Sequence, residues 1–145
     1  MEIKNALNYR ESIVLLLTAE KLPVNDLPDI LDNFVVAVEN DKLIGAAGLE
    51  IYGDYGLLRS LAVRPGFRDQ GIAAKLVKNI EAHASAKGLR AIYLLTETAT
   101  DYFLKKNYEK ITRAGVPDAI QVSSEFSYAC PQSAIVMKKT LEISK

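Results

Sequence analysis

The segment VRPGFRDQGIAAKLV, residues 63–77, constrains the fold more than any other stretch of the chain. An apolar run stops at Pro65-Gly66, and a sequence with helical spacing begins at Gly71. A glycine at this point lets the backbone come close to a ligand, because no Cβ stands in the way. The first turn of a helix also exposes backbone N–H groups, which attract anions. The segment therefore predicts a strand, a tight corner and a helix, with an anion such as a pyrophosphate at the corner.

Two side-chain features support an anion at this corner. Ala73 and Ala74 keep the first helical turn narrow, and Arg68 can add a charge-assisted contact. The segment matches neither G-x-x-x-x-G-K-[ST] nor a G-x-G-x-x-G that opens a parallel β-α-β unit. Taken alone, it leaves open a plain connection between strand and helix in which Gly71 serves only packing.

The composition limits the function classes that the chain can belong to. It has 145 residues, 18 basic against 18 acidic side chains, and 49% hydrophobic residues, as expected for one globular domain, residues 1–145. A net charge near zero argues against a dedicated surface for nucleic acid or for an anionic membrane. Because the N-terminus lacks the regions of a signal peptide and Cys130 stands alone, we expect a cytoplasmic protein without an internal disulfide. One cysteine and one histidine, His83, also predict no metal site.

The remaining periodicity predicts strands and helices along the whole chain. Apolar and β-branched runs predict strands at residues 2–6, 34–39, 43–52, 55–63, 91–95, 108–112 and 134–138. Helical spacing predicts helices at residues 9–19, 70–87 and 98–106. A capping box of Asn8 and Glu11 should start the first helix, and Gly88 should end the second. This order predicts an α/β or α+β fold, with helices on both faces of a mixed sheet.

Residues 61–73, LAVRPGFRDQGIA, resemble the donor-binding motif of the GNAT acyltransferase superfamily, a strand ending in L-A-V followed by Arg-x-x-Gly-x-Gly/Ala. The resemblance implies a GNAT fold with a mostly antiparallel, twisted central sheet of about six or seven strands. It also implies acetyl-CoA as the co-substrate. The pantetheine arm would then contact Leu61, Ala62 and Val63, and the pyrophosphate would contact Arg68, Asp69, Gln70, Gly71, Ile72, Ala73 and Ala74.

A second block, TETATDYFLKKNYEKI at residues 96–111, resembles a later element of the same family. Thr96 stands where the family has Asn, and Phe103 where it has Tyr, so that both are expected at the donor. In many members the Tyr hydroxyl protonates the leaving thiolate, which Phe103 cannot do. Tyr102 is our candidate acid, and the alternatives are water and four further hydroxyls, those of Ser123, Ser124, Ser127 and Tyr128.

The C-terminal part narrows the resemblance to one branch of the family. Residues 116–141 resemble the ending of small stand-alone acetyltransferases found with arsenic-resistance operons, which are similar to the acetyltransferase domain of N-acetylglutamate synthase. This implies direct acetyl transfer to a small amine, namely the α-amine of an amino acid or an amino-acid-like toxin. Two alternatives remain: an acetylase of protein N-termini or lysines, and a non-catalytic acyl-CoA-binding module. A homodimer through the C-terminal strand is an alternative to a monomer.

The acceptor side has three candidate residues. Many relatives place a Glu before the L-A-V, but this chain has leucines at positions 57 and 58, so Glu50 is our candidate general base. Arg59 and Arg113 are candidates for clamping an acceptor carboxylate. The competing interpretations are an ordinary exposed strand carboxylate and solvated surface arginines. Regular alternation along the strand would place Arg59 on the face opposite Ala62.

A covalent route through an acetyl-cysteine is a weaker alternative. A nucleophilic Cys130 would need a base within reach, and His83 lies in the middle of a predicted helix. The sequence therefore favours direct transfer, with Cys130 interpreted as a small buried residue.

Overall fold

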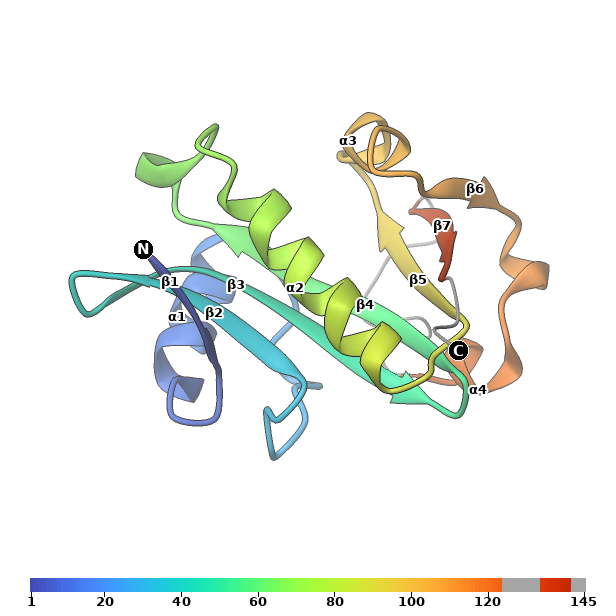
Figure 1. Ribbon diagram of the computed structural model, residues 1–145, viewed down its shortest axis with the longest axis horizontal. Helices are drawn as coiled ribbons and strands as arrows, with labels where there is room; N and C mark the ends of the chain where they lie inside the picture. Colours follow the sequence, from blue (N-terminus) through green and yellow to red (C-terminus); the bar gives the residue numbers. More distant parts are fainter. Residues whose placement is uncertain (124–133, 142–145) are drawn as a thin grey trace. The chain divides into compact units, whose positions relative to one another are not determined.

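The computed structural model describes residues 1–123 and 134–141, and Figure 1 shows the arrangement of their strands and helices. Seven strands are present in the described residues: β1 (Glu2–Asn5), β2 (Phe34–Glu39), β3 (Lys42–Tyr52), β4 (Tyr55–Val63), β5 (Ala91–Thr96), β6 (Glu109–Ile111) and β7 (Ile135–Thr140). The helices of that same part are α1 (Arg10–Ala19), α2 (Ile72–Ala86), α3 (Thr100–Leu104) and α4 (Asp118–Gln121).

The seven strands form one mixed sheet in the order β1-β2-β3-β4-β5-β7-β6. Strand β5 pairs parallel to β4 and antiparallel to β7, while β1 with β2, β2 with β3 and β6 with β7 are antiparallel. The predicted mixed, mostly antiparallel sheet of six or seven strands is therefore confirmed.

The chain divides into two compact units. The first consists of Met1–Leu49 and Ser60–His83, and the second of Glu50–Arg59 and Ala84–Lys145. Strands β3 and β4 each contribute residues to both units.

In the first unit, α1 and α2 cover opposite faces of β3. Ala46 belongs to an apolar cluster with Ile13 and Leu17 of α1. A Cβ added to the neighbouring Gly45 would instead meet Leu76 of α2 at 3.1 Å. Because successive side chains of a strand point to opposite faces, the two helices lie on different sides of the strand. The prediction of helices on both faces of the sheet is confirmed.

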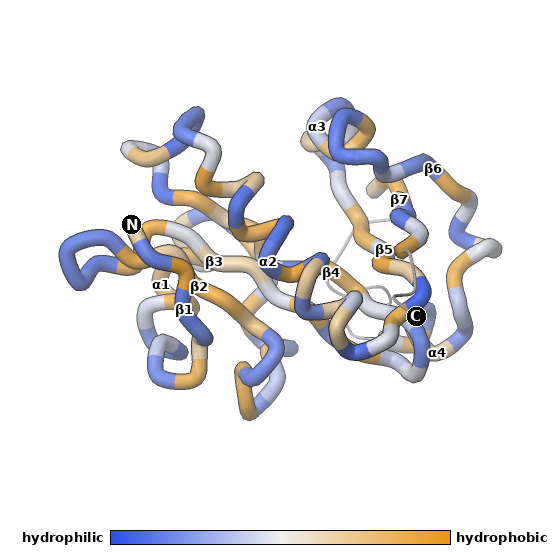
Figure 2. Tube along the Cα trace, in the orientation of Figure 1, coloured by the Kyte–Doolittle hydropathy of each residue, from blue (hydrophilic) through white to orange (hydrophobic). Residues whose placement is uncertain are grey.

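A tight hairpin joins β2 to β3. Glu39 pairs with Lys42, so the loop is Asn40-Asp41 alone, one residue shorter than the sequence suggested. Both loop residues have positive φ, at 50° and 63°. This is the backbone of a type I′ turn, which Asn and Asp tolerate better than most residues. Strand β2, FVVAVE, is coloured mainly as hydrophobic in Figure 2 and is largely buried.

The second unit has its own apolar core beneath α4. Its buried members are Leu57, Ala91, Tyr93, Val116, Ile120 and Val136, and they come from β4, β5, β7 and the segment around α4. Strand β5 pairs with β7 from Ala91↔Thr140 to Thr96↔Ile135. This core gives the residues around 116–122 a defined structure that the sequence left as an unassigned segment.

Two predicted helix ranges and one predicted helix cap are wrong. Helix α2 starts at Ile72 and not at residue 70, because Asp69 and Gly71 have φ values of 63° and 78°, outside the α region. The predicted capping box is absent, since the N-cap of α1 is Tyr9, without a side-chain cap hydrogen bond. Helix α3 is shorter than predicted and is followed by Asn107 with φ 71°. Gly88, with φ 77°, ends α2 as predicted.

We expect the substitution Gly48→Ala to destabilise the fold, because a Cβ at this position would lie 2.3 Å from Cε2 of the buried Phe34 ring. Overpacking of this kind should lower the free energy of unfolding by about 1–3 kcal/mol in urea denaturation. Gly115→Ala is the matched control, because its Cβ would meet only Thr112 Oγ1 at 3.7 Å. An unfolding curve of Gly48→Ala that overlays that of the unchanged protein would contradict this packing.

Candidate functional site

The corner between β4 and α2 combines an unusual backbone with open space. After Val63 the chain makes a 3₁₀ turn at Pro65–Phe67, and Lys75 N–H donates to the Gly71 carbonyl at 3.1 Å to begin α2. A Cβ at Gly71 would meet no heavy atom within 4 Å, although its φ of 78° favours glycine. Gly71 therefore leaves the backbone accessible at the start of the helix.

The start of α2 can attract an anion. The first N–H groups of an α-helix have no intrahelical partner and lie at the positive end of the helix dipole. Helix α2 has 15 residues and no acidic side chain in its first turn, so nothing in that turn opposes an anion. Ile72 is buried, whereas Ala73 and Ala74 are half-buried. The predicted anion site is thus physically reasonable at residues 71–74.

Arg68 is bound on two sides within the first unit. Its Nε donates to the Val63 carbonyl at 3.2 Å, and its Nη2 forms an ion pair with Glu20 Oε1, just beyond α1. The Arg68 side chain is 51% exposed and the Glu20 side chain 19%. Arg68 therefore connects the end of β4 to α1, and half of its surface remains available to a ligand. Glu20 has no signal in the sequence, because no local pattern links two residues that are 48 positions apart.

An open pocket of about 410 Å³ adjoins this connection. It is lined by α1 and the turn before α2, through Leu15, Leu16, Ala19, Glu20, Arg64, Pro65, Gly66 and Phe67. Its walls are mostly apolar, and its charged side chains are Glu20 and Arg64.

The end of β4 is not a regular strand. Ser60 has a φ of 59°, which is rare for a residue other than glycine and interrupts the alternation of side chains. Simple alternation therefore no longer supports the placement of Arg59 and Ala62 on opposite faces, which stays a prediction. Ala62 and Val63 are buried and Leu61 is half-buried.

In the second unit, a carboxylate is held between two neighbouring side chains. Tyr52 donates its hydroxyl to Glu50 Oε1 at 3.1 Å, and Arg59 Nη1 lies 3.5 Å from Glu50 Oε2. The side chain of Arg59 is 0% exposed and that of Glu50 15%. The interpretations of Glu50 as an ordinary exposed carboxylate and of Arg59 as a solvated arginine are both wrong. We call Glu50, Tyr52 and Arg59 the Glu50 cluster.

Tyr52 is a member of this cluster that the sequence analysis missed. Burial, together with the charge of Glu50 and the hydrogen bond to it, raises the pKa of Tyr52 from 10.0 to about 12. Ser123 and Arg59 act in the opposite direction and do not cancel the increase. The only signal in the sequence was the spacing of two residues, which places Glu50 and Tyr52 on the same face of β3.

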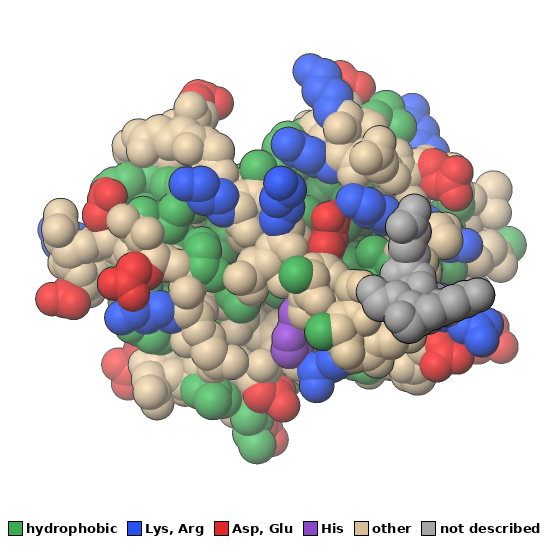
Figure 3. All heavy atoms as spheres, in the orientation of Figure 1, with side chains coloured by type: hydrophobic (Ala, Val, Ile, Leu, Met, Phe, Trp, Pro, Cys, Tyr) green, Lys and Arg blue, Asp and Glu red, His purple; other side chains and the backbone are tan. Residues whose placement is uncertain are grey.

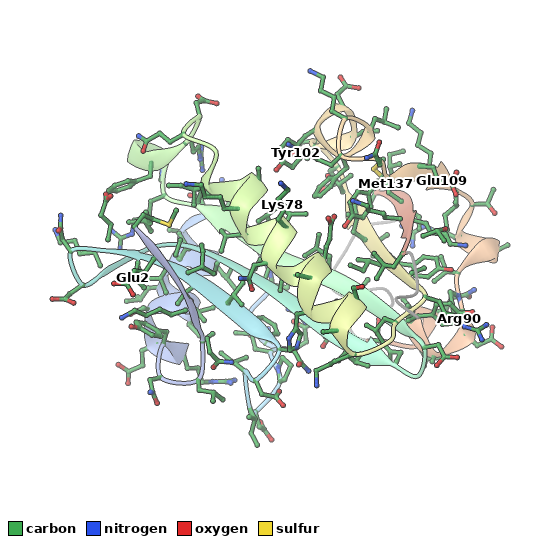
Figure 4. The ribbon with its side chains drawn as sticks, viewed as in Figure 1. Glu2, Lys78, Arg90, Tyr102, Glu109 and Met137 are labelled. Atoms are coloured by element: carbon green, nitrogen blue, oxygen red, sulfur yellow. The ribbon has the colours of Figure 1, made fainter. Side chains whose placement is uncertain are left out.

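The residues predicted near the donor in the second block have clear packing roles. Thr96 Oγ1 accepts a hydrogen bond from Ala99 N–H at 3.0 Å, just before α3. Phe103 is buried and packs edge-on against Tyr102 and Tyr108, with ring centroids 5.1 and 5.3 Å apart. Tyr102 belongs to α3 (Figure 4), and Lys106 Nζ lies 5.6 Å from its ring centroid. Contact of these side chains with a donor stays a prediction.

Arg113 lies in a 3₁₀ turn at Arg113–Gly115 and is half-buried. Its Nη2 donates to the Ala134 carbonyl at 3.5 Å, at the start of β7. Its carbonyl accepts a hydrogen bond from Gln121 Nε2 at 3.3 Å. These hydrogen bonds connect Arg113 to Ala134 and Gln121 within the second unit. Its role toward an acceptor stays a prediction.

Of the other candidates, Ser124, Ser127, Tyr128 and Cys130 lie outside the described residues. His83 Nε2 lies 2.8 Å from Asn33 Oδ1, which gives it a local partner in the first unit.

Within residues 1–123 and 134–141 no group of three His, Cys, Asp or Glu side chains could hold a metal ion. In that part of the chain, no helix has the length and apolar character needed to cross a membrane. Basic and acidic side chains are interspersed on the face seen in Figure 3.

A comparison with known protein families identifies the family. Residues 13–111, which contain most of α1, the corner and β5, match the model of the acetyltransferase (GNAT) family. The chain belongs to the GNAT family. The resemblance predicted from residues 61–73 and 96–111 is thereby confirmed at the level of the family.

The individual proteins similar to this GNAT chain include a named acetyltransferase and two solved structures that contain CoA. An amino-acid acetyltransferase of Ralstonia nicotianae is 31% identical over 88 residues, which are 59% of this chain and 20% of that protein. A Mycobacterium tuberculosis structure in complex with CoA has a TM-score of 0.82 at 22% identity, over 98% of this chain and 100% of that one. N-acetylglutamate synthase from Neisseria gonorrhoeae, complexed with CoA and N-acetyl-glutamate, gives a TM-score of 0.80 at 16% identity, over 97% of this chain and 35% of that one. The chain thus spans only about a fifth of the length of the first relative, and the structural likenesses establish the GNAT fold.

The Glu50 cluster predicts that Tyr52 ionises at a higher pH than an ordinary tyrosine. Titration of tyrosinate absorbance should show a component with a pKa of about 12 that is absent from Tyr52→Phe. Glu50→Gln should lower the pKa of this component, because the negative charge that opposes tyrosinate formation is removed. Circular dichroism at each pH checks that the protein remains folded. A titration curve that is the same for Tyr52→Phe and the unchanged protein, apart from amplitude, would contradict the cluster.

Proposed function

We propose that the chain is an acetyl-CoA-dependent N-acetyltransferase that transfers acetyl directly to a small amine. The observation that carries the proposal is the corner at residues 63–74, where Gly71 leaves open space beside the start of α2. Membership of the GNAT family supports it, as do the CoA complexes of structurally similar proteins.

The donor would be bound mainly by backbone groups of the first unit. The pyrophosphate would accept hydrogen bonds from the N–H groups of residues 68–74, and the pantetheine arm would lie along residues 61–63. The half-exposed Arg68 guanidinium would add a positive charge, while its bonds to Val63 and Glu20 keep it in place. A ligand held mostly by backbone amides suits the small side chains at positions 71, 73 and 74.

The reaction would be a nucleophilic attack of the amine nitrogen on the thioester carbonyl carbon. The C–N bond forms, the C–S bond breaks, and the acetyl group becomes an amide. An ammonium substrate loses one proton before the attack and a second as the amide forms. The leaving thiolate takes up one of these, so that one proton is released overall. A backbone N–H of Ala62 or Val63 would stabilise the oxyanion, and a thiolate with a pKa near about 8.5 can be protonated by water.

Glu50 would accept the proton from the acceptor amine. Its carboxylate is mostly buried, yet 15% of the side chain is exposed, so an amine or a water can reach it. Arg59 Nη1 lies 3.5 Å from Glu50 Oε2 and pairs with this carboxylate. Tyr102 remains the candidate acid for the thiolate, with water as the alternative. No covalent enzyme intermediate is needed.

The acceptor would be the α-amine of an amino acid or of an amino-acid-like toxin. This is supported by the amino-acid acetyltransferase among the relatives and by the complex of N-acetylglutamate synthase with N-acetyl-glutamate. In this proposal Arg59 and Arg113 recognise the acceptor carboxylate. Arg59 would have to do so while paired with Glu50, and Arg113 while bound to the Ala134 carbonyl. The protein would act on free small molecules, with neither nucleic acid nor membrane as a partner.

A second candidate is a non-catalytic acyl-CoA-binding module. It is favoured by Phe103, which has no hydroxyl, and by Leu57 and Leu58, where many relatives carry an acid. Such a module would keep the donor corner and lack turnover. Acetylation of a protein N-terminus or lysine is a further alternative.

The test is a panel of amino acids, amino-acid analogues and polyamines with acetyl-CoA, followed by thiol release and product mass. We expect acetylation of at least one amine, and a fall of kcat/KM by at least about 100-fold in Glu50→Gln, because a general base is lost. Glu109→Gln is the control, because Glu109 is exposed on β6. Thiol release at background for every amine would overturn the proposal, and tight acetyl-CoA binding without turnover would favour the non-catalytic module.

A further inference from the structure

The Glu50 carboxylate is held at both of its oxygens, by partners from two strands. Tyr52 lies two residues along β3 and binds Oε1, whereas Arg59 lies on β4 and approaches Oε2. A carboxylate with a single partner can rotate about its last torsion, because that torsion is broad. Two partners at separate oxygens fix the plane of the carboxylate. The orientation of Glu50 therefore depends on both neighbours.

We propose that Tyr52 is a positioning residue for Glu50, and that its hydroxyl sets the direction in which the carboxylate meets the acceptor amine. This inference rests on the proposed function, because it assigns Tyr52 a role in the same reaction. Tyr52 does not touch the reacting atoms in this account. It acts through the hydrogen bond to Oε1, at 3.1 Å.

The Tyr52 side chain is itself held in place by packing. Its ring packs against the apolar core of the second unit, which includes Leu57 and Ile120. The same core contains Tyr93 and Val136 and joins residues of several strands. A hydroxyl on a ring that is fixed by packing can hold a carboxylate in one orientation.

Tyr52 remains a proton donor over the range in which the reaction would operate. The groups that act on the pKa of Tyr52 are Glu50, Arg59 and Ser123. The largest effect on that pKa comes from burial, which raises it. Because its pKa is about 12, the hydroxyl keeps its proton well above neutral pH. It can therefore neither act as the base nor compete with Glu50 for the amine proton. Its bond to Glu50 stays intact whenever Glu50 is ionised.

The two partners of Glu50 then have different effects. Arg59 contributes a positive charge, and its buried side chain leaves it little freedom to move. Tyr52 contributes a directed hydrogen bond without a charge. Loss of the Tyr52 hydroxyl should therefore leave the ion pair in place, while the carboxylate becomes less well oriented. A tyrosine that served only packing would not show this effect, because phenylalanine retains the ring.

The experiment compares Tyr52→Phe with Tyr55→Phe, using the best acceptor from the amine panel. Tyr55 packs against the same apolar core, and its ring lies edge-on to that of Tyr93, so it controls for removal of a tyrosine hydroxyl. For Tyr52→Phe we expect kcat to fall about tenfold, because the carboxylate of the base is less well oriented. The KM for acetyl-CoA should not change, because Tyr52 is not among the residues proposed to bind the donor.

The outcomes separate this inference from the proposed function. If Glu50→Gln abolishes turnover and Tyr52→Phe keeps the kcat of Tyr55→Phe, the positioning role is overturned and the proposed function stands. If no amine is acetylated, or if Glu50→Gln is fully active, the proposed role of Glu50 fails and the inference fails with it. A fall in kcat for Tyr52→Phe that comes with an equally large rise in the KM for acetyl-CoA would also overturn it, because a general loss of structure predicts that result.

Discussion

The backbone at the corner between β4 and α2 is the constraint on which the proposed donor site depends. Asp69 and Gly71, both with positive φ, precede α2, and a Cβ added at Gly71 would meet no heavy atom within 4 Å. The first N–H groups of the helix have no intrahelical partner. Arg68 holds this turn through the Val63 carbonyl and the Glu20 carboxylate. The side chain that is expected to attract the pyrophosphate is therefore also the one that connects the corner to α1. Donor binding and the stability of the corner should be linked through this residue.

The Glu50 cluster gives the second unit a different kind of site. Burying a carboxylate is unfavourable unless it is paired and hydrogen-bonded, and here Arg59 and Tyr52 satisfy both requirements. The partial exposure of Glu50 distinguishes it from a purely structural ion pair. In the first unit the ligand would be recognised by backbone groups, whereas in the second it would be recognised by side chains. A backbone site depends on a short local pattern of small residues, which a sequence motif records. A side-chain site depends on contacts between strands, so the sequence predicts the donor site better than the acceptor site.

The sequence predicted the features that depend on local pattern, and missed those that depend on contacts between distant residues. Strands such as β2 and β3 and the helix α2 followed from apolar periodicity, and the family followed from residues 61–73. The sequence marks Arg59 as a candidate for binding an acceptor carboxylate, but its burial beside Glu50 is visible only in the structure. Glu20 and Tyr52 had no signal beyond composition and spacing. The positive φ of Ser60 could not be predicted, because a single backbone torsion in a non-glycine residue is set by its surroundings.

The central claim is that backbone amides at residues 68–74 bind the pyrophosphate of CoA. The most direct test is a titration of isotope-labelled protein with CoA, followed through its assigned amide NMR spectrum. The account predicts that the largest and saturable shifts occur at the amides of residues 68–74, and that dephospho-CoA produces the same shifts there, because it keeps the pyrophosphate. Saturating CoA that leaves these amides unchanged, while other residues shift, would contradict the account.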